Sequence, residues 1–164
     1  MKNILVIGAH GQTGRQVVAQ LKENADFTRV AGVRSQSQVK EFTDQGIEVR
    51  VVDVRQSVTE IKKSLDNIDA IVISIGGGWM VDLDGKVKIY QAAEQAGIKR
   101  VVLVSAGAIQ HFHDEKKLAW MDEWEEYSAA MYYADILLQQ SNLDYTIVRP
   151  ENLTNEPGTG KVTI

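Results

Sequence analysis

The stretch VIGAHGQTGR, residues 6–15, decides how the rest of the chain is interpreted. Its glycines, Gly8, Gly11 and Gly14, are spaced by three residues and directly follow the apolar run of residues 3–7. A glycine turn between a buried strand and a helix lets the backbone approach a pyrophosphate, whose charge is met by free N–H groups at the helix start. The spacing is GxxGxxG, one residue longer at the front than the GxGxxG fingerprint of dinucleotide-binding domains. The stretch therefore predicts a nucleotide site at the first strand-to-helix turn.

Short apolar runs alternate with helical patterns along the whole chain. Strands are expected at residues 3–7, 28–33, 47–54, 70–75, 100–104 and 145–148, and helices at 13–24, 37–45, 58–65, 85–96 and 118–140, the first of them capped near Thr13. Nearly continuous apolar strands that alternate with helices are typical of right-handed crossovers and a parallel sheet covered on both faces. The sequence therefore predicts an α/β fold, a single Rossmann-like doubly wound parallel sheet.

The length of 164 residues favours one domain spanning residues 1–164. The closing GKVTI resembles the start of another strand, so we expect a C-terminal substrate portion that is short or truncated. A net charge of −4 argues against nucleic-acid binding, which requires a basic surface. No window holds the roughly 18 apolar residues of a membrane span, no signal peptide is present, and cysteine is absent, so a cytoplasmic protein is expected. His111 and His113 have no apparent third ligand, which predicts no metal site.

In a doubly wound sheet the ligand lies beyond the carboxyl ends of the strands, beside the first strand. Residues that follow a strand are therefore candidates for cofactor binding. They are Gly8, His10, Gly11, Gln12, Thr13, Gly14 and Arg15; Arg34 and Ser35; Asp53 and Val54; Ser74, Ile75 and Gly76; Ser105; and Pro150. For His10 and Arg15, exposure to solvent is the alternative interpretation.

Arg34 lies twenty residues beyond Gly14, where an acid would hold a ribose 2′-hydroxyl and an arginine would meet a 2′-phosphate. No acid stands nearby, so NADP(H) is favoured as cofactor over NAD(H). A solvated loop arginine is the alternative.

At this point the chain resembles a known family. The residues that carry the resemblance are the segments GAHGQTGR, VVDV around Asp53, VLVSAGA around Ser105 and LDYTIVRPENLTNEPGTG, together with Arg34. They are similar to those of atypical short-chain dehydrogenase/reductase proteins of the NAD(P)H-binding, NmrA-like group. This group includes NADH-flavin reductases and biliverdin reductase B. The resemblance implies NADP(H) bound by the glycine loop and Arg34, Asp53 beside the adenine, and Ser105 near the nicotinamide.

The chain departs from that family at a catalytic pair. Family members with a Tyr-x-x-x-Lys pair use the lysine charge to lower the tyrosine pKa, and here the two positions hold Tyr127 and Met131. With an ordinary pKa of about 10, Tyr127 would be a poor acid near neutral pH. Ser105 and Tyr127 are still the expected catalytic residues, because direct hydride transfer requires only stacking and proximity.

Aromatic residues recur at Trp120, Trp124 and Tyr127, on one face of the expected helix. They could pack on the sheet, form the wall of an aromatic substrate pocket, or belong to an interface. The run Gly76 to Gly78 similarly indicates either close approach of a ligand or a flexible loop.

Three functions are consistent with these patterns. The first is an NADPH-dependent oxidoreductase that passes hydride to a flavin, quinone or similar small planar acceptor. The second is a non-catalytic NADP-binding redox sensor with a regulatory protein partner, and the third is a nucleotide-sugar epimerase-type enzyme, which the missing lysine disfavours. A homodimer is left open.

Overall fold

A computed structural model describes residues 1–160 and contains a six-stranded, all-parallel sheet with the order β3-β2-β1-β4-β5-β6. The strands are β1 (Lys2–Ile7), β2 (Phe27–Val33), β3 (Glu48–Val51), β4 (Ala70–Ile73), β5 (Arg100–Val104) and β6 (Asp144–Val148). The strand order reverses between β1 and β4, which is the switch point where doubly wound folds bind ligands. The predicted Rossmann-like fold is confirmed.

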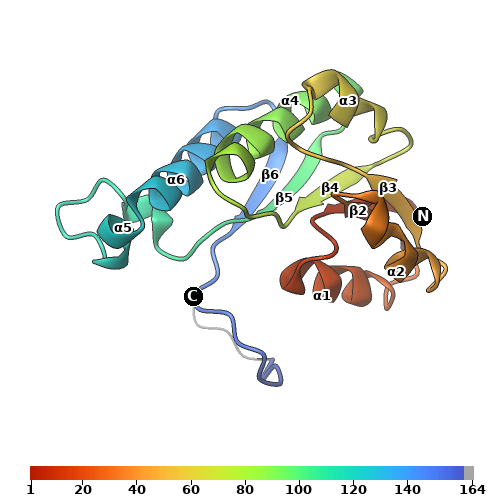
Figure 1. Ribbon diagram of the computed structural model, residues 1–164, viewed down its shortest axis with the longest axis horizontal. Helices are drawn as coiled ribbons and strands as arrows, with labels where there is room; N and C mark the ends of the chain where they lie inside the picture. Colours follow the sequence, from red (N-terminus) through yellow and green to blue (C-terminus); the bar gives the residue numbers. More distant parts are fainter. Residues whose placement is uncertain (161–164) are drawn as a thin grey trace.

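Helices cover both faces of this sheet (Figure 1). They are α1 (Gln12–Leu21), α2 (Val39–Thr43), α3 (Val58–Lys63), α4 (Lys86–Ala96), α5 (Trp120–Glu123) and α6 (Glu125–Gln139). Short 3-10 turns occur at η1 (Gln36–Gln38) and η3 (Ile109–His111), and η2 (Met80–Gly85) is a π-helical turn that leads into α4. In Figure 1, α1 and α2 lie on one side of the sheet, and α3, α4 and α6 lie on the other.

Two apolar clusters fill the spaces between the sheet and its helices, and β1 contributes to both. Leu5 and Ile7 belong to the larger cluster, together with residues of α3 and α4, whereas Val6 belongs to the smaller cluster with Val18 and Phe42. Successive side chains of a strand point to opposite faces of a sheet. The uninterrupted apolar run of residues 4–7 in β1 therefore matches burial on both sides of the sheet.

Several predicted boundaries were wrong at the edge of the sheet where the strands end. The ladders of β3 and β4 stop at Val51 and Ile73, and the following residues leave the sheet to form the loops of the site. Val52 and Val54 lie beyond the strand and are nevertheless buried, as members of the larger apolar cluster. The helix α1 begins after Gly11 and not at a Thr13 cap.

The predicted helix over residues 118–140 is broken at Trp124, whose backbone leaves the helical region (φ −115°, ψ 47°). Residues three apart share a face in an unbroken helix. Here Met121 is fully buried while Trp124 is 61% exposed, so the break points the two side chains into different surroundings. The predicted further strand at the C-terminus falls mainly on residues 161–164, which lie outside the described part.

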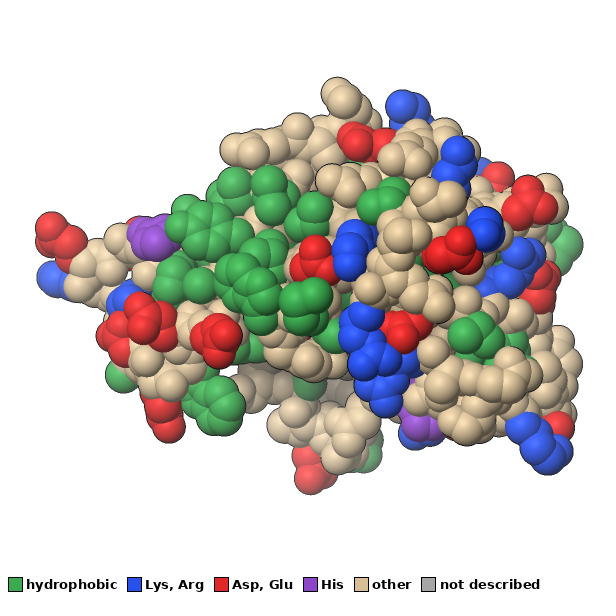
Figure 2. Space-filling model, turned by 45° about the horizontal axis from the view of Figure 1, so that its top comes forward, with side chains coloured by type: hydrophobic (Ala, Val, Ile, Leu, Met, Phe, Trp, Pro, Cys, Tyr) green, Lys and Arg blue, Asp and Glu red, His purple; other side chains and the backbone are tan. Residues whose placement is uncertain are grey.

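Hydrophobic side chains gather on the surface over α6, where Tyr133 and Leu137 are exposed, whereas charged side chains dominate near α3 (Figure 2). A homodimer through such a surface remains a prediction. Over residues 1–160, no helix combines the length and apolar character needed to cross a membrane.

Candidate functional site

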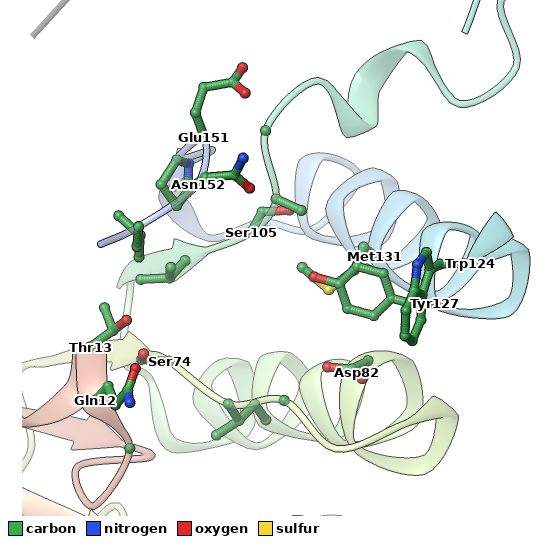
Figure 3. Close-up of a pocket in the computed structure, with 18 of the residues that line it drawn as sticks. Gln12, Thr13, Ser74, Asp82, Ser105, Trp124, Tyr127, Met131, Glu151 and Asn152 are labelled. Carbon is green, nitrogen blue, oxygen red and sulfur yellow. The ribbon is translucent and has the colours of Figure 1, made fainter. Parts of the chain in front are cut away.

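A cleft of about 1060 Å³ opens at the carboxyl ends of the central strands, between the glycine loop and α6 (Figure 3). Its lining brings together nine predicted site residues: Gly11, Gln12, Thr13, Ser74, Ile75, Gly76, Ser105, Tyr127 and Pro150. The aromatic residues Trp120 and Trp124 also line it, which favours the pocket-wall interpretation over packing on the sheet. Figure 3 shows Gln12, Thr13 and Ser74 at one end, Trp124, Tyr127 and Asp82 at the other, and Ser105 between them. We call these the loop end and the acceptor end.

Two glycines of the loop end are required by packing inside the protein. Gly8 has a φ of +90°, and a Cβ there would lie 2.1 Å from the carbonyl oxygen of Ser74. A Cβ on Gly14 would lie 2.1 Å from the carbonyl oxygen of Gly8. The outer glycines thus let the loop fold tightly against β4 and α1, and Gly11 between them lines the cleft.

The start of α1 has the features of an anion site. Gly11 is its extended N-cap, no side chain caps it, and its first turn holds no acidic residue. Within residues 1–160, the main-chain N–H groups of Gln12 and Thr13 have no protein acceptor, and both residues line the cleft. Free N–H groups and the helix dipole favour a negative group here, so the residues present fit a pyrophosphate.

Arg34 and Asp53 lie beyond the cleft lining, at the ends of the neighbouring strands β2 and β3. Asp53 accepts two hydrogen bonds from the Arg55 guanidinium, at 3.0 and 2.8 Å. These bonds lower the pKa of Asp53, and the nearby charge of Arg34 contributes in the same direction. The Arg34 side chain is exposed, while its main-chain N–H donates to the Gln38 side chain at 2.9 Å. This is the position where a 2′-phosphate was predicted.

Other predicted cofactor residues have protein partners. Arg15 donates to both carboxylate oxygens of Glu41, at 2.7 and 2.9 Å, and His10 lies 3.3 Å from the same carboxylate. Ser35 shares a hydrogen bond with the Ser37 hydroxyl at 2.9 Å. The role of these residues, and of the buried Val54, toward a cofactor stays a prediction.

Ser105, between the two ends, and Tyr127, at the acceptor end, line the cleft with different degrees of exposure. Ser105 is 7% exposed, and its hydroxyl has no hydrogen-bond partner within residues 1–160. Tyr127 is 39% exposed, yet burial of its hydroxyl and the charge of Asp82 both raise its pKa. A tyrosine with a raised pKa releases its proton even less readily than an ordinary one. The structure therefore strengthens the doubt about acid–base chemistry by Tyr127.

Two charged residues of this end were not predicted from the sequence. Asp82 lies in η2 and lines the cleft, and Lys86 begins α4 directly behind it; both are buried. Their four-residue spacing is a possible signal, but Asp84 and Lys88 share that spacing and form a more exposed pair. The sequence alone does not distinguish the buried pair from the exposed one.

A second buried carboxylate ties α6 to the end of β6. Asp135 is 2% exposed and accepts a hydrogen bond from Arg149 at 2.8 Å. Arg149 belongs to the YTIVRP segment, and the next residue, Pro150, lines the cleft. This bond fixes the segment that closes the cleft opposite the glycine loop.

Residues 8–164 match the NAD(P)H-binding family. The chain belongs to this family. NAD(P)H is therefore its cofactor class, as the glycine loop predicted, and the resemblance to atypical short-chain dehydrogenase/reductase proteins is confirmed. The match includes the glycine loop and every strand after β1.

Individual relatives show what kinds of protein share this fold. The chain is 38% identical to the uncharacterized sugar epimerase YhfK of Bacillus subtilis, over 98% of this chain and 76% of that protein. It is similar to the structure of the oxidoreductase ylbE from Lactococcus lactis, with 35% identity, a TM-score of 0.84, and coverage of 96% of this chain and 73% of the other. It is also similar to ChuY, an anaerobillin reductase from Escherichia coli O157:H7, with 26% identity, a TM-score of 0.80, and coverage of 98% and 78%. The family is thus oxidoreductase-like, with sugar epimerase and reductase names among its members.

Proposed function

We propose that this chain is an NADPH-dependent oxidoreductase that reduces a small planar acceptor, such as a flavin or a quinone, by direct hydride transfer. The observation that carries the proposal is the continuity of one cleft from the free N–H groups of α1 to the aromatic wall of α6. One end suits the pyrophosphate of a dinucleotide, and the other suits a flat, apolar ring.

The residues of the loop end would hold the cofactor without a covalent role. The N–H groups of Gln12 and Thr13 would donate to the pyrophosphate, and Arg34 would pair with the 2′-phosphate. When bound, the dihydronicotinamide supplies a hydride. Arg34 supports NADPH over NADH because its exposed guanidinium follows β2 without a neighbouring acid on that loop.

The acceptor end would position the second reactant against the cofactor. Trp124 and Tyr127 offer ring faces, and Ser105, whose hydroxyl has no partner among the described residues 1–160, offers one polar contact at the centre of the cleft. A predominantly aromatic pocket with few polar groups orients a flat ligand by stacking. Stacking holds the reacting atoms in contact, which is the main requirement of direct hydride transfer.

An NADP-binding redox sensor is the second candidate, supported by Met131 and by the raised pKa of Tyr127, which leave the usual proton donor inactive. A sugar epimerase, as one relative is named, remains a weaker alternative because the cleft lacks a Tyr-x-x-x-Lys lysine at position 131.

Two experiments separate these functions. The first is calorimetric titration with NADPH and NADH, and the second is a turnover assay with a panel of flavins, quinones and nucleotide sugars. We expect tighter binding of NADPH and its consumption with a planar acceptor. Tight binding without turnover of any acceptor would support the sensor. Conversion of a nucleotide sugar without net consumption of cofactor would support the epimerase.

A further inference from the structure

We propose that Lys86 and Asp82 form the proton-supplying pair of the acceptor end, with Lys86 replacing, from another helix, the lysine that position 131 lacks. This inference rests on the proposed function and extends it. Hydride transfer to a quinone or flavin leaves an anionic heteroatom that requires a proton, and Tyr127 is poorly suited to give one.

Lys86 is a buried ammonium group with a poor set of partners. Its side chain is 0% exposed, and its Nζ lies 2.8 Å from the Sδ of Met131. A thioether is only a weak hydrogen-bond acceptor. The space next to Met131 is therefore occupied by a lysine after all, reaching in from α4.

Asp82 connects this ammonium group to the cleft. Its Oδ2 accepts hydrogen bonds from the main-chain N–H groups of Gly77 and Gly78, at 3.3 and 2.8 Å. Its Oδ1 has no hydrogen-bond partner within residues 1–160 and lies 3.9 Å from the Lys86 Nζ. A Cβ placed on Gly76, which lines the cleft, would lie 3.6 Å from the same Oδ1. One carboxylate oxygen thus lies between the buried lysine and the cleft.

The groups around the pair come from three directions and agree with a proton-donating role for Lys86. Burial lowers the pKa of Lys86 to about 8, against the opposing effect of the Asp82 and Asp135 carboxylates. Tyr90, on α4, has its pKa raised by burial and by Asp135, so it stays protonated. Arg149 engages Asp135 from the end of β6. Lys86 is thus protonated at neutral pH and can release its proton at a pH only slightly above neutral, as a general acid must.

The acceptor takes two electrons and one hydrogen as hydride from NADPH, which becomes NADP⁺. Asp82 passes a proton to the heteroatom of the acceptor while it takes one from the Lys86 ammonium, so the carboxylate remains ionised. The neutral Lys86 amine then regains a proton from solvent by way of Asp82, which lines the cleft, and the reduced acceptor carries one hydride and one proton.

The chain contains a matched control for this pair. Asp84 and Lys88 have the same four-residue spacing, and their charged atoms lie 2.6 Å apart. Their side chains are 37% and 21% exposed, whereas those of Asp82 and Lys86 are 2% and 0% exposed. Lys88→Met therefore removes a similar lysine without touching the cleft.

The first test uses the protein without cofactor and follows the lysine side chains by NMR as the pH is raised. We expect a resonance that titrates near pH 8, is absent from Lys86→Met, and persists in Lys88→Met. Asp82→Asn should lower the pKa of Lys86 further, because a carboxylate that favours the ammonium is lost. Titration of Lys86 together with the exposed lysines would overturn the proposal.

The second test measures hydride transfer to a quinone at saturating NADPH over a range of pH. Lys86→Met and Asp82→Asn should slow the transfer about 100-fold, a common loss when a general acid is removed. The dissociation constant of NADPH should stay unchanged in both of these variants. The rate of hydride transfer should stay unchanged in Lys88→Met. In the unmodified protein the rate of hydride transfer should fall as the pH rises through about 8, and this fall should be absent from Lys86→Met.

Lys86→Arg separates a proton donor from a merely structural charge, because arginine keeps the charge but does not release a proton. A rate restored by arginine would overturn the proposal, as would full activity of Lys86→Met. If Lys86→Met does not fold, the isosteric Asp82→Asn decides. Binding of NADPH without turnover by the unmodified protein would instead contradict the oxidoreductase proposal itself, whereas turnover that survives both substitutions contradicts only the pair.

Discussion

The two ends of the cleft are built in opposite ways. The loop end is formed by main chain, and its shape depends on the absence of side chains at Gly8 and Gly14. The acceptor end is formed by side chains from η2, α5 and α6, and one carboxylate oxygen of Asp82 has no hydrogen-bond partner within residues 1–160. A backbone cradle serves any ligand with a pyrophosphate, whereas a side-chain wall selects one acceptor. Under the proposed function, cofactor binding and acceptor chemistry depend on separate sets of residues that can be altered independently.

The largest effect is expected from Gly14→Ala, at the loop end. The new methyl group would lie 2.1 Å from the Gly8 carbonyl oxygen, so the loop must shift away from α1. We expect a loss of unfolding free energy of about 3 kcal/mol, as for other overpacked sites, and loss of NADPH binding. Urea unfolding and calorimetry measure the two effects. Gly158→Ala, where the added atom meets open space, is the control; normal NADPH binding by Gly14→Ala would contradict the description of the cradle.

The buried Lys86 behind the acceptor end should make the free energy of unfolding depend on pH. Because burial lowers the pKa of Lys86 from 10.5 to about 8, the unfolded state binds more protons than the folded state between these values. Stability contributed by this group is therefore lowest below pH 8 and rises as the pH increases, by about 2 kcal/mol up to pH 10. Urea unfolding at several pH values should show this rise in the unmodified protein and in Lys88→Met. An equal rise in Lys86→Met would show that another group causes it.

A smaller effect is expected from Arg34→Ala, which tests the far side of the loop end. Loss of a charge-assisted contact should weaken NADPH binding by about 1.5 kcal/mol and leave NADH nearly unchanged. Calorimetric titration of both cofactors gives the comparison. Equal losses of binding free energy for NADPH and NADH would contradict the assignment of Arg34 to the 2′-phosphate.

The smallest effect should come from Glu41→Gln, which releases Arg15 and His10. Surface ion pairs contribute little, so the unfolding free energy should fall by less than about 1 kcal/mol. Urea unfolding checks this value, with Lys40→Gln, which breaks the neighbouring exposed pair with Asp44, as control. A loss several times larger would mean that this cluster holds the loop end together.

The sequence predicted the loop end better than the acceptor end for a physical reason. Gly8 and Gly14 satisfy local steric demands between a strand and the helix that follows it, and such demands leave a regular spacing. Burial on both sides likewise made β1 readable, whereas the residues of the edge strands β3 and β6 are exposed or half-buried. The acceptor end depends on long-range meetings, such as that of Lys86 with Met131, forty-five residues away. No local pattern records which of two equally spaced Asp and Lys pairs will be buried, and none indicated the backbone break at Trp124.

The distribution of tryptophan gives the molecule an optical asymmetry. Trp120 and Trp124 line the cleft at its acceptor end, and the third of the chain's three tryptophans, Trp79, directly precedes η2, which carries Asp82. Two of the three indole rings therefore line one half of the cleft, and the glycine loop contains no tryptophan. An acceptor that stacks on these rings should quench the intrinsic fluorescence by contact, so occupancy of that half can be followed in the unlabelled protein while a nucleotide is already bound.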